Sequence, residues 1–348
     1  MRRLIVVVLL AGLLAACSSS SKSASPQNTA TTVPAVTTTT IPRCTVRSEA
    51  ALERIDLNVG GKARYALVHV PAHWNGKTAL PVLLSFHGLG SNADQQRSID
   101  GFVARSDKDN FIVMWPQASG SLADLGAAWD LKGTSELTFV RALLANLARR
   151  ECVNPARVYA TGLSYGGAMT DMLACNFADH IAAAAPVSAY LPERPCTPAR
   201  PIPILSFHGV EDHLLPYKGG GPSNQRPFEQ WGADWAKRYD CTATPTTTRY
   251  KPTVEQIKYS GSKAPLVLYR VHHNGHTWPG HPLGIDHQVL VNYFSGKTTG
   301  KPFALMVYLG LTPEEFADTI SLANTQIDAT TMILRFFGLE KPASAAGN

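Results

Sequence analysis

Continuous apolar runs recur along the chain from Arg64 onward. They consist largely of β-branched, aromatic and aliphatic residues, which is typical of strands covered on both faces of a sheet. The predicted strands are residues 65–70, 81–88, 111–116, 157–164, 182–189, 203–209 and 266–273.

Stretches with helical spacing lie between these runs. Residues 135–150, 227–240 and 324–338 repeat apolar side chains every three or four positions, as amphipathic helices do. Strands that alternate with helices of this length predict an α/β fold: a mostly parallel central sheet with helices on both faces. We expect this domain to span residues 44–341.

The chain before this domain follows neither pattern. Arg2 and Arg3 precede an apolar run, residues 4–14, that is too short to span a bilayer, so we expect a signal peptide over residues 1–16. The sequence "LAAC", which ends at Cys17, resembles the lipobox of bacterial lipoproteins. That resemblance implies cleavage before Cys17 and a lipid on its sulfur, with a plain secretory cleavage site as the alternative.

Residues 17–43 consist mainly of Ser, Thr, Ala and Pro. Such a segment buries too little apolar surface to offset its chain entropy, so it predicts a flexible linker. Together these features predict an exported protein, lipid-anchored to the outer face of the bacterial cell membrane, with partial release into the medium left open.

Composition excludes two classes. A hydrophobic content of 45% with 17% charged residues argues against disorder throughout and supplies a substantial core. The formal net charge of +6 falls to +4 without Arg2 and Arg3, and the remaining excess is scattered. No basic cluster indicates nucleic acid as a partner.

The cysteines contain no CxxC pair, which argues against zinc ribbons and thioredoxin-like redox sites. Export permits disulfides. Cys175 and Cys196 are separated by a short interval that suits a helix end facing a following loop, so we expect them to pair. The pairing of the other three is open: Cys44, Cys152 and Cys241.

The stretch "GLSYGG" (162–167) carries the first candidate chemistry. It follows the strand residues 157–161 and opens a helix near Tyr165, and Gly-x-Ser-x-Gly at such a turn is a nucleophile elbow. Small glycines there avoid collisions, and Ser164 projects above the sheet near a helix N-terminus. The alternative is that Ser164 merely caps that helix.

A nucleophilic serine needs a base, and the base needs an orienting acid; both follow the elbow in the order acid, histidine. Asp212 follows the strand 203–209, and His276 follows the strand 266–273. Since the carboxyl ends of parallel strands meet at one rim, we expect Ser164, Asp212 and His276 to converge.

Other residues compete for these roles. Glu211 is an alternative acid, and His272 and His273 are alternative bases. His208 is expected to pack in the core and His213 to face solvent. The histidines near "HHNGH" lack an accompanying acidic ligand pattern, so we expect no metal.

The loop "SFHGLGSN" (85–92) supplies the remaining part. In such folds one oxyanion donor is an amide in this loop and the other is the amide after the nucleophile. We therefore expect the backbone N–H groups of Leu89 and Tyr165 to form an oxyanion hole, with His87 bracing the loop.

Four stretches carry a family resemblance: "SFHGLG", "CVNPARVYATGLSYGGAM", "HGVEDHLLPY" and "GHTWPG". With them the chain resembles α/β-hydrolases of the polyhydroxybutyrate depolymerase and feruloyl esterase group, carbohydrate esterase family 1. The likeness runs from about residue 64 to residue 280 and resumes over residues 328–338. It implies esterase chemistry with Ser164, Asp212 and His276 as the triad.

Residues 281–323 depart from that group and read as an insertion. They begin just after His276, so we expect them to cover or flank the active site, with a distant decoration as the alternative. Where relatives often have a cysteine before the last strand this chain has Ser262, and no polymer-binding domain follows the catalytic one. Trp129 and Trp278 are candidate pocket aromatics, with ordinary core packing as the alternative for Trp129.

These observations predict a membrane-tethered serine esterase that needs no cofactor and acts on small or oligomeric esters. A serine peptidase on the same fold and a non-catalytic binding lipoprotein are the alternatives. The sequence decides neither the acyl and alcohol groups nor the oligomeric state.

Overall fold

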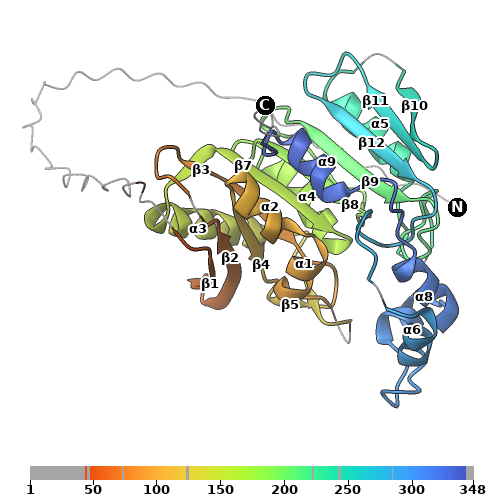
Figure 1. Ribbon diagram of the computed structural model, residues 1–348. Helices are drawn as coiled ribbons and strands as arrows, with labels where there is room; N and C mark the ends of the chain where they lie inside the picture. Colours follow the sequence, from red (N-terminus) through yellow and green to blue (C-terminus); the bar gives the residue numbers. More distant parts are fainter. Residues whose placement is uncertain are drawn as a thin grey trace, which may run out of the picture. The chain divides into compact units, whose positions relative to one another are not determined.

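The structure is a computed structural model that describes residues 44, 48–72, 74–122, 125–221, 223–241, 244–283 and 285–341 (Figure 1). All of them belong to the second of two units into which contacts divide the chain, residues 41–348. The predicted signal peptide, the linker and Cys17 lie outside the described residues. No described helix is long and apolar enough to cross a membrane.

A ten-stranded sheet forms the centre of the fold, in the order β1-β2-β4-β3-β7-β8-β9-β12-β11-β10. Its six central strands run parallel to one another. They are β4 (Ile112–Pro116), β3 (Leu80–Phe86), β7 (Val153–Leu163), β8 (Ala183–Val187), β9 (Ile204–Gly209) and β12 (Leu266–Val271). Each of them coincides with an apolar run, because burial on both faces removes the need for polar positions.

Antiparallel hairpins extend the sheet at both edges. β1 (Ala51–Val59) and β2 (Lys62–Val70) pair at one edge, and β10 (Thr246–Lys251) and β11 (Val254–Tyr259) at the other. The sequence analysis missed β1, β10 and β11. β10 is exposed along its whole length, so its backbone pairing, and not an apolar pattern, defines it. A separate short hairpin joins β5 (Gly120–Ser121) and β6 (Ala127–Ala128).

Helices cover both faces of the sheet (Figure 1). On one face α3 (Ser135–Arg150), α4 (Tyr165–Asn176) and α5 (Phe228–Arg238) pack on side chains such as Val82 and Leu84. On the other face α1 (Ala93–Ile99), α2 (Phe102–Asp109) and α9 (Ala329–Phe336) share a core with Leu83. The alternation of Val82, Leu83 and Leu84 between the two cores is the period-two pleat of β3. The predicted α/β fold with a mostly parallel sheet is confirmed.

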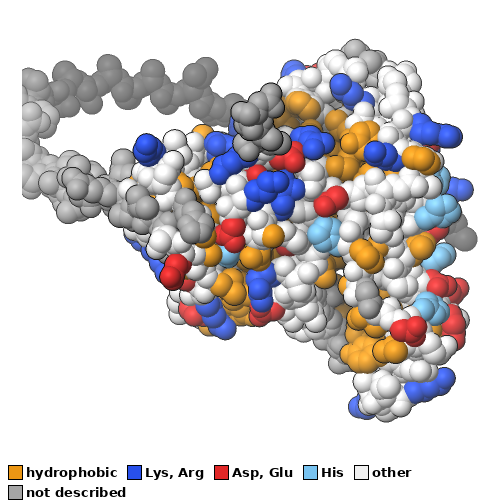
Figure 2. Space-filling view, in the orientation of Figure 1, with side chains coloured by type: hydrophobic (Ala, Val, Ile, Leu, Met, Phe, Trp, Pro, Cys, Tyr) orange, Lys and Arg blue, Asp and Glu red, His pale blue; other side chains and the backbone are white. Residues whose placement is uncertain are grey.

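The predicted insertion forms a small cap of three helices. They are α6 (His287–Phe294), α7 (Ala304–Leu309) and α8 (Pro313–Ser321). Their buried faces share an apolar core with Leu214 and Leu215, which lie in the loop after β9. Hydrophobic side chains also gather on the outside of the cap (Figure 2), where Val307 is 59% exposed.

Two disulfides join described residues. Cys175 pairs with Cys196, as the spacing predicts, and ties the end of α4 to the following loop. Cys44 pairs with Cys152, which anchors the start of the described chain just before β7. The thiol of Cys241 lies 2.8 Å from the backbone oxygen of Ser260 and is in neither disulfide.

Candidate active site

The three residues expected to carry the chemistry stand at one rim of the sheet. Ser164 directly follows β7, Asp212 follows β9 by three positions, and His276 lies in the loop after β12. These strands are parallel, and only β8 separates β7 from β9 in the sheet. Their carboxyl ends therefore deliver the three side chains to the same edge, where parallel sheets place their sites.

Ser164 has a strained backbone. Its φ of 60° and ψ of −120° lie in a region that side chains with a Cβ rarely adopt. The turn is held on both sides, because the Ser164 N–H donates to Val187 O at 3.0 Å and the Ser164 carbonyl accepts from Tyr190 N at 3.1 Å. The Ser164 side chain makes no capping hydrogen bond to α4, so capping does not account for the serine at this position.

The glycines around Ser164 are required by close backbone approach. A Cβ on Gly162 would lie 2.6 Å from the Gly166 carbonyl oxygen and 2.7 Å from that of Phe86. A Cβ on Gly166 would overlap the Phe86 carbonyl outright. The start of α4 therefore sits directly on the end of β3, and only glycine permits that contact.

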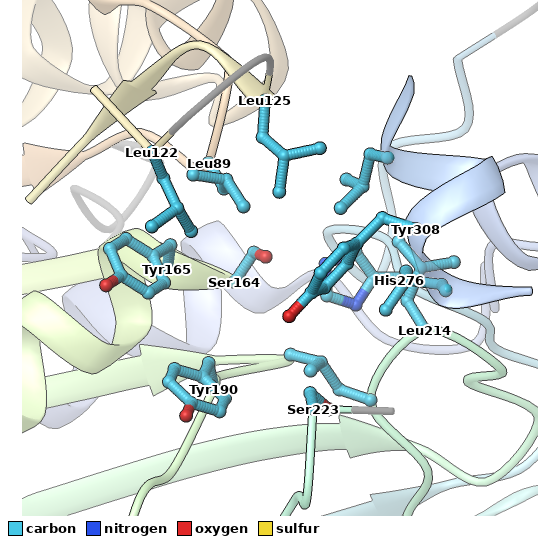
Figure 3. Close-up of a pocket in the computed structure, with 13 residues that line it drawn as sticks. Leu89, Leu122, Leu125, Ser164, Tyr165, Tyr190, Leu214, Ser223, His276 and Tyr308 are labelled. Carbon is cyan, nitrogen blue, oxygen red and sulfur yellow. The ribbon is translucent and has the colours of Figure 1, made fainter. Parts of the chain in front are cut away.

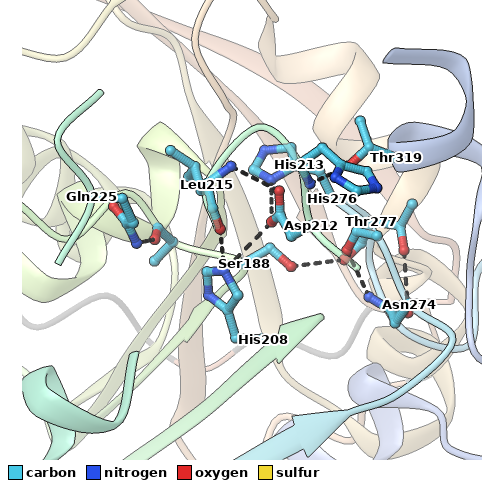
Figure 4. A network of polar contacts seen from close by, with 12 residues as sticks. Ser188, His208, Asp212, His213, Leu215, Gln225, Asn274, His276, Thr277 and Thr319 are labelled. Carbon is cyan, nitrogen blue, oxygen red and sulfur yellow. Dashed lines mark hydrogen bonds and ion pairs between the residues drawn. The ribbon is translucent and has the colours of Figure 1, made fainter. Parts of the chain in front are cut away.

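His276 is paired with Asp212 (Figure 4). The Nδ1–H of His276 donates to Asp212 Oδ2 at 2.7 Å, and both side chains are almost wholly buried. Asp212 Oδ1 accepts a second hydrogen bond from Leu215 N at 2.8 Å. The carboxylate thus fixes the imidazole tautomer that leaves Nε2 free to accept a proton.

The competing acid and bases point elsewhere. Glu211 accepts from the Asn274 backbone N–H at 3.3 Å. His272 faces Glu255, and His273 is exposed. His213 is exposed as expected. None of the four contacts the His276–Asp212 pair through a hydrogen bond among the described residues.

The cap contributes to the His276 loop. The backbone N–H of Gly275 donates to Leu322 O at 2.8 Å, and that of His276 donates to Thr319 O. Thr319 also accepts, through its hydroxyl, from His213 N at 2.9 Å. The end of α8 therefore holds both the histidine loop and the acid loop, a role that no local sequence signal indicates.

The loop after β3 lies beside Ser164. A Cβ on Gly88 would be 3.3 Å from Ser164 Cβ. Within the described residues, no hydrogen bond occupies the Leu89 or Tyr165 amide. The Tyr165 amide belongs to the first turn of α4, where N–H groups have no partner in the helix. Both amides are thus available as donors next to the serine.

His87 braces this loop, as expected. Its Nδ1–H donates to Gly88 O at 2.7 Å, and its Nε2 accepts from Ala118 N at 3.1 Å. Burial lowers the pKa of His87 to about 4, although the hydrogen bond to Gly88 opposes the shift. The ring is therefore neutral near pH 7 and acts as a fixed bridge between two loops.

An apolar pocket of about 210 Å³ opens over Ser164 (Figure 3). Ser164, His276, Leu89 and Tyr165 line it together. Its other lining residues are Leu122, Leu125, Tyr190, Leu214, Leu215, Ser223, Leu305, Tyr308 and Leu309. The rings of Tyr165 and Tyr190 are stacked with centroids 5.8 Å apart.

Neither Trp129 nor Trp278 lines this pocket, so Trp278 is not the expected pocket aromatic, and Trp129 takes the alternative of core packing. Trp129 is 2% exposed, and its Nε1–H donates to His87 O at 2.8 Å beneath the loop. Trp278 is 1% exposed and donates to Thr330 Oγ1 at 2.9 Å on the opposite core. An indole with a buried hydrogen-bond acceptor can bury its apolar ring surface and still pair its N–H inside the protein.

The cap supplies a pocket aromatic, Tyr308, that no sequence motif indicated. Leu305, Tyr308 and Leu309 of α7 line the pocket, and the Tyr308 ring lies on the side of the pocket that holds His276 (Figure 3). The insertion therefore flanks the candidate site. Its apolar stretch 302–311 was the signal in the sequence. Among the described residues, no group of three potential ligands lies close enough to hold a metal ion.

The arrangement of strands and helices is that of the α/β-hydrolase fold. The solved acetyl xylan esterase from Aspergillus awamori superposes with a TM-score of 0.50 at 15% identity, covering 65% of this chain and 94% of that one. At this identity the likeness establishes the fold. No protein-family model matches the chain.

Curated sequences point in the same direction as the motifs. The chain is 29% identical over 239 residues to feruloyl esterase B of Piromyces equi, and this covers 64% of the chain and 44% of that protein. It is 29% identical over 126 residues to poly(3-hydroxyalkanoate) depolymerase C of Paucimonas lemoignei, covering 34% of the chain and 30% of that protein. The expected resemblance to both groups is confirmed, and the chain spans less than half the length of each relative.

Proposed function

We propose that the protein hydrolyses carboxylic esters through an acyl-enzyme on Ser164. One observation carries the proposal: a serine in a strained turn lines an apolar pocket together with a histidine whose other ring nitrogen donates to a buried carboxylate. The similarity to proteins named as a feruloyl esterase and a poly(3-hydroxyalkanoate) depolymerase supports ester substrates.

In the first half-reaction His276 Nε2 accepts the proton of Ser164 as its oxygen attacks the ester carbonyl carbon. The Leu89 and Tyr165 amides donate to the oxyanion that forms, and each such donor is typically worth about 3 kcal/mol. The tetrahedral intermediate collapses with cleavage of the bond to the alkoxy oxygen. His276 returns the proton to that oxygen, and the alcohol leaves.

In the second half-reaction water repeats the attack on the acyl-serine ester. His276 takes the water proton, the oxyanion forms again, and the bond to Ser164 breaks as the proton returns to the serine oxygen. The products are a carboxylic acid and the free enzyme. Asp212 holds the imidazole tautomer and stabilises the imidazolium that forms in each half-reaction.

The pocket supports an apolar or aromatic group on one side of the ester. Leucine side chains and the stacked pair Tyr165 and Tyr190 form most of its wall. Such walls bind aliphatic and aromatic groups through burial. Relatives named as a feruloyl esterase and a polyester depolymerase support both an aromatic and an aliphatic acyl group as candidates.

We also propose that the protein is exported and tethered by a lipid on Cys17. The support is the sequence "LAAC" at the end of the apolar run and the Ser/Thr/Pro-rich stretch after it. Expression in a bacterial host with a labelled fatty acid tests this. Incorporation that is lost in Cys17→Ala supports the anchor, and an unlabelled wild-type protein in the medium contradicts it.

A fluorophosphonate probe tests the chemistry, because only an activated serine reacts rapidly with it. Labelling of the wild type and not of Ser164→Ala supports the proposal, whereas an unlabelled wild type favours the non-catalytic alternative. Turnover should then be compared on p-nitrophenyl esters, hydroxycinnamates, acetylated sugars and hydroxybutyrate oligomers, with peptides in parallel. Faster turnover of peptides than of every ester would favour a peptidase.

A further inference from the structure

His208 is a fully buried histidine that stands next to the proposed acid. It lies in β9, four residues before Asp212, and has 0% exposure. Its Nε2 is 2.8 Å from Leu215 O and 3.5 Å from Asp212 Oδ2 (Figure 4). Leu215 N in turn donates to Asp212 Oδ1 at 2.8 Å. His208 Nε2 thus lies close to both Asp212 and Leu215, the two ends of the loop 212–215.

The geometry fixes the tautomer of His208. The Leu215 carbonyl can only accept, so the proton is on Nε2. The opposite nitrogen, Nδ1, is buried and has no hydrogen-bond partner among the described residues. The His208 ring packs against an aromatic side chain, with its centroid 5.0 Å from that of Phe228.

A second proton on His208 would bury an unpaired N–H and a charge, which is costly. Burial accordingly lowers the pKa of His208, although the neighbouring Asp212 carboxylate opposes the shift. The titratable groups that face the ring are Asp212, His276 and Tyr217. His208 is therefore a neutral donor with one fixed N–H.

Neutrality matters because the His208 ring lies close to the carboxylate that pairs with His276. Asp212 Oδ2 accepts from His276 Nδ1–H at 2.7 Å and lies 3.5 Å from His208 Nε2, whose own N–H donates to Leu215 O. A cation at His208 would compete with the protonated His276 for the same carboxylate oxygen. A neutral His208 instead holds Leu215, whose N–H donates to Asp212 Oδ1, and leaves the charge of the carboxylate to His276.

We infer that His208 is a positioning residue for the proposed reaction: its Nε2–H, through Leu215 and Asp212, holds the carboxylate oriented toward His276. The inference rests on the proposed function, since it concerns the same site. The sequence pattern predicts only that His208 packs in the core. The inference adds a role for it in orienting the Asp212–His276 pair.

Replacement of His208 tests the inference. His208→Leu keeps apolar volume and removes the donor, so kcat should fall roughly 10- to 100-fold, as is typical when the outer partner of an active-site group is removed. KM should stay within about twofold, because His208 itself does not line the pocket. His208→Gln restores an N–H near the Nε2 position and should recover kcat to within about threefold of wild type.

His208→Asn is the matched polar variant, since its shorter amide does not reach Leu215 O. It should lose kcat as His208→Leu does, and it replaces that variant if the leucine form does not fold. His69→Leu is the control, because His69 is also buried, at 4% exposure, and lies on β2 across the sheet. It should lower thermal stability and leave kcat within about twofold.

A double-mutant cycle separates positioning from general damage. In an Asp212→Asn background, His208→Leu should cost less than about twofold, because the residue through which it acts is already altered. Independent, multiplicative losses would overturn the inference, as would a folded His208→Leu or His208→Asn protein with wild-type kcat. A wild type that neither hydrolyses esters nor reacts with fluorophosphonate overturns the proposed function and the inference together; an active wild type with an unaffected variant overturns the inference alone.

Discussion

At the scale of single residues, Ser164 combines strain with little packing. Its side chain is half-buried at the pocket and its backbone is held in an unfavourable conformation by neighbours. Backbone strain of this kind persists where the surrounding structure over-determines it, and it is concentrated at functional sites. We therefore expect removal of the hydroxyl to remove the proposed chemistry and to leave the fold intact.

Ser164→Ala should abolish esterase activity with little change in melting temperature. Loss of a triad serine typically lowers turnover by about 10⁶-fold. The measurement is kcat on p-nitrophenyl acetate together with a thermal melt. Activity within tenfold of wild type would remove Ser164 from the mechanism.

Asp212→Asn should lower turnover by about 10⁴-fold, because the amide favours the wrong imidazole tautomer. The variant retains the acceptor for Leu215 N, so it should fold. Glu211→Gln is the matched control, since Glu211 binds the Asn274 amide instead of His276. A larger loss in Glu211→Gln than in Asp212→Asn would show that the acid is the neighbouring residue.

At the scale of elements, the cap has two distinct contacts with the site. The end of α8 holds the His276 loop by backbone hydrogen bonds, and α7 supplies side chains to the pocket wall. Deletion of the whole insertion would remove both contacts at once. Point substitutions in α7 separate substrate selection from loop support.

Tyr308→Ala should change selectivity among esters with little effect on acetate. The ring lines the pocket, so its loss enlarges the space for bulky groups and weakens contact with those that fill it. We expect the ratio of kcat/KM values for a hydroxycinnamate and p-nitrophenyl acetate to change by about 10-fold, the effect of roughly 1.4 kcal/mol of differential binding.

Val307→Ala is the control on the same helix. Val307 is 59% exposed and does not line the pocket. The ratio of kcat/KM for the hydroxycinnamate to kcat/KM for p-nitrophenyl acetate should match that of the wild type. An equal change in both variants would indicate a general disturbance of α7, and no change in Tyr308→Ala would show that the cap does not select substrates.

At the scale of the whole molecule, two buried groups tie folding stability to pH in opposite directions. Burial raises the pKa of Asp100 to about 6, while hydrogen bonds from Ser85 and Trp115 oppose the shift. As the pH falls, Asp100 takes up its proton at a higher pH in the folded protein than in the unfolded chain. Protonation of Asp100 therefore stabilises the fold. This contribution to the free energy of unfolding is complete below about pH 4 and is lost as the pH rises through about 6.

His87 acts in the reverse sense. Its pKa of about 4 in the folded state lies below the value near 6.5 of an unfolded histidine. The unfolded chain binds the proton first on acidification, so stability is complete above about pH 6.5 and is lost as the pH falls through about 4. Between these limits the two groups offset each other.

Asp100→Asn should therefore steepen the acid sensitivity of folding. Between pH 6 and pH 4 the variant should lose roughly 3 kcal/mol more unfolding free energy than the wild type, from a shift of about two pKa units. Urea unfolding at several pH values measures this difference. Asp94→Asn is the control, because Asp94 lies on the exposed face of α1, the helix that Asp100 caps. Its unfolding free energy should vary with pH as that of the wild type does. The same pH dependence in Asp100→Asn as in the wild type would contradict the prediction.

The sequence by itself determined what local pattern encodes. Apolar runs marked the six parallel strands, because strands buried on both faces need no polar positions. The turn at 162–167 could be recognised from the sequence because the backbone contacts around Ser164 leave room only for glycine, which marks the motif. Since parallel strand ends share one rim, chain order alone placed Asp212 and His276 beside that serine.

Only the tertiary structure showed the contacts between residues that are far apart in the chain. The burial of Trp129 and Trp278 depends on His87 O and Thr330, which are far away in the chain. The local sequence therefore could not show that both indoles pack in the core. The Cys44–Cys152 pairing and the return of α8 to the His276 loop likewise join positions that share no local signal. A contact between remote segments is set by how whole elements pack, and no window of sequence contains both sides of it.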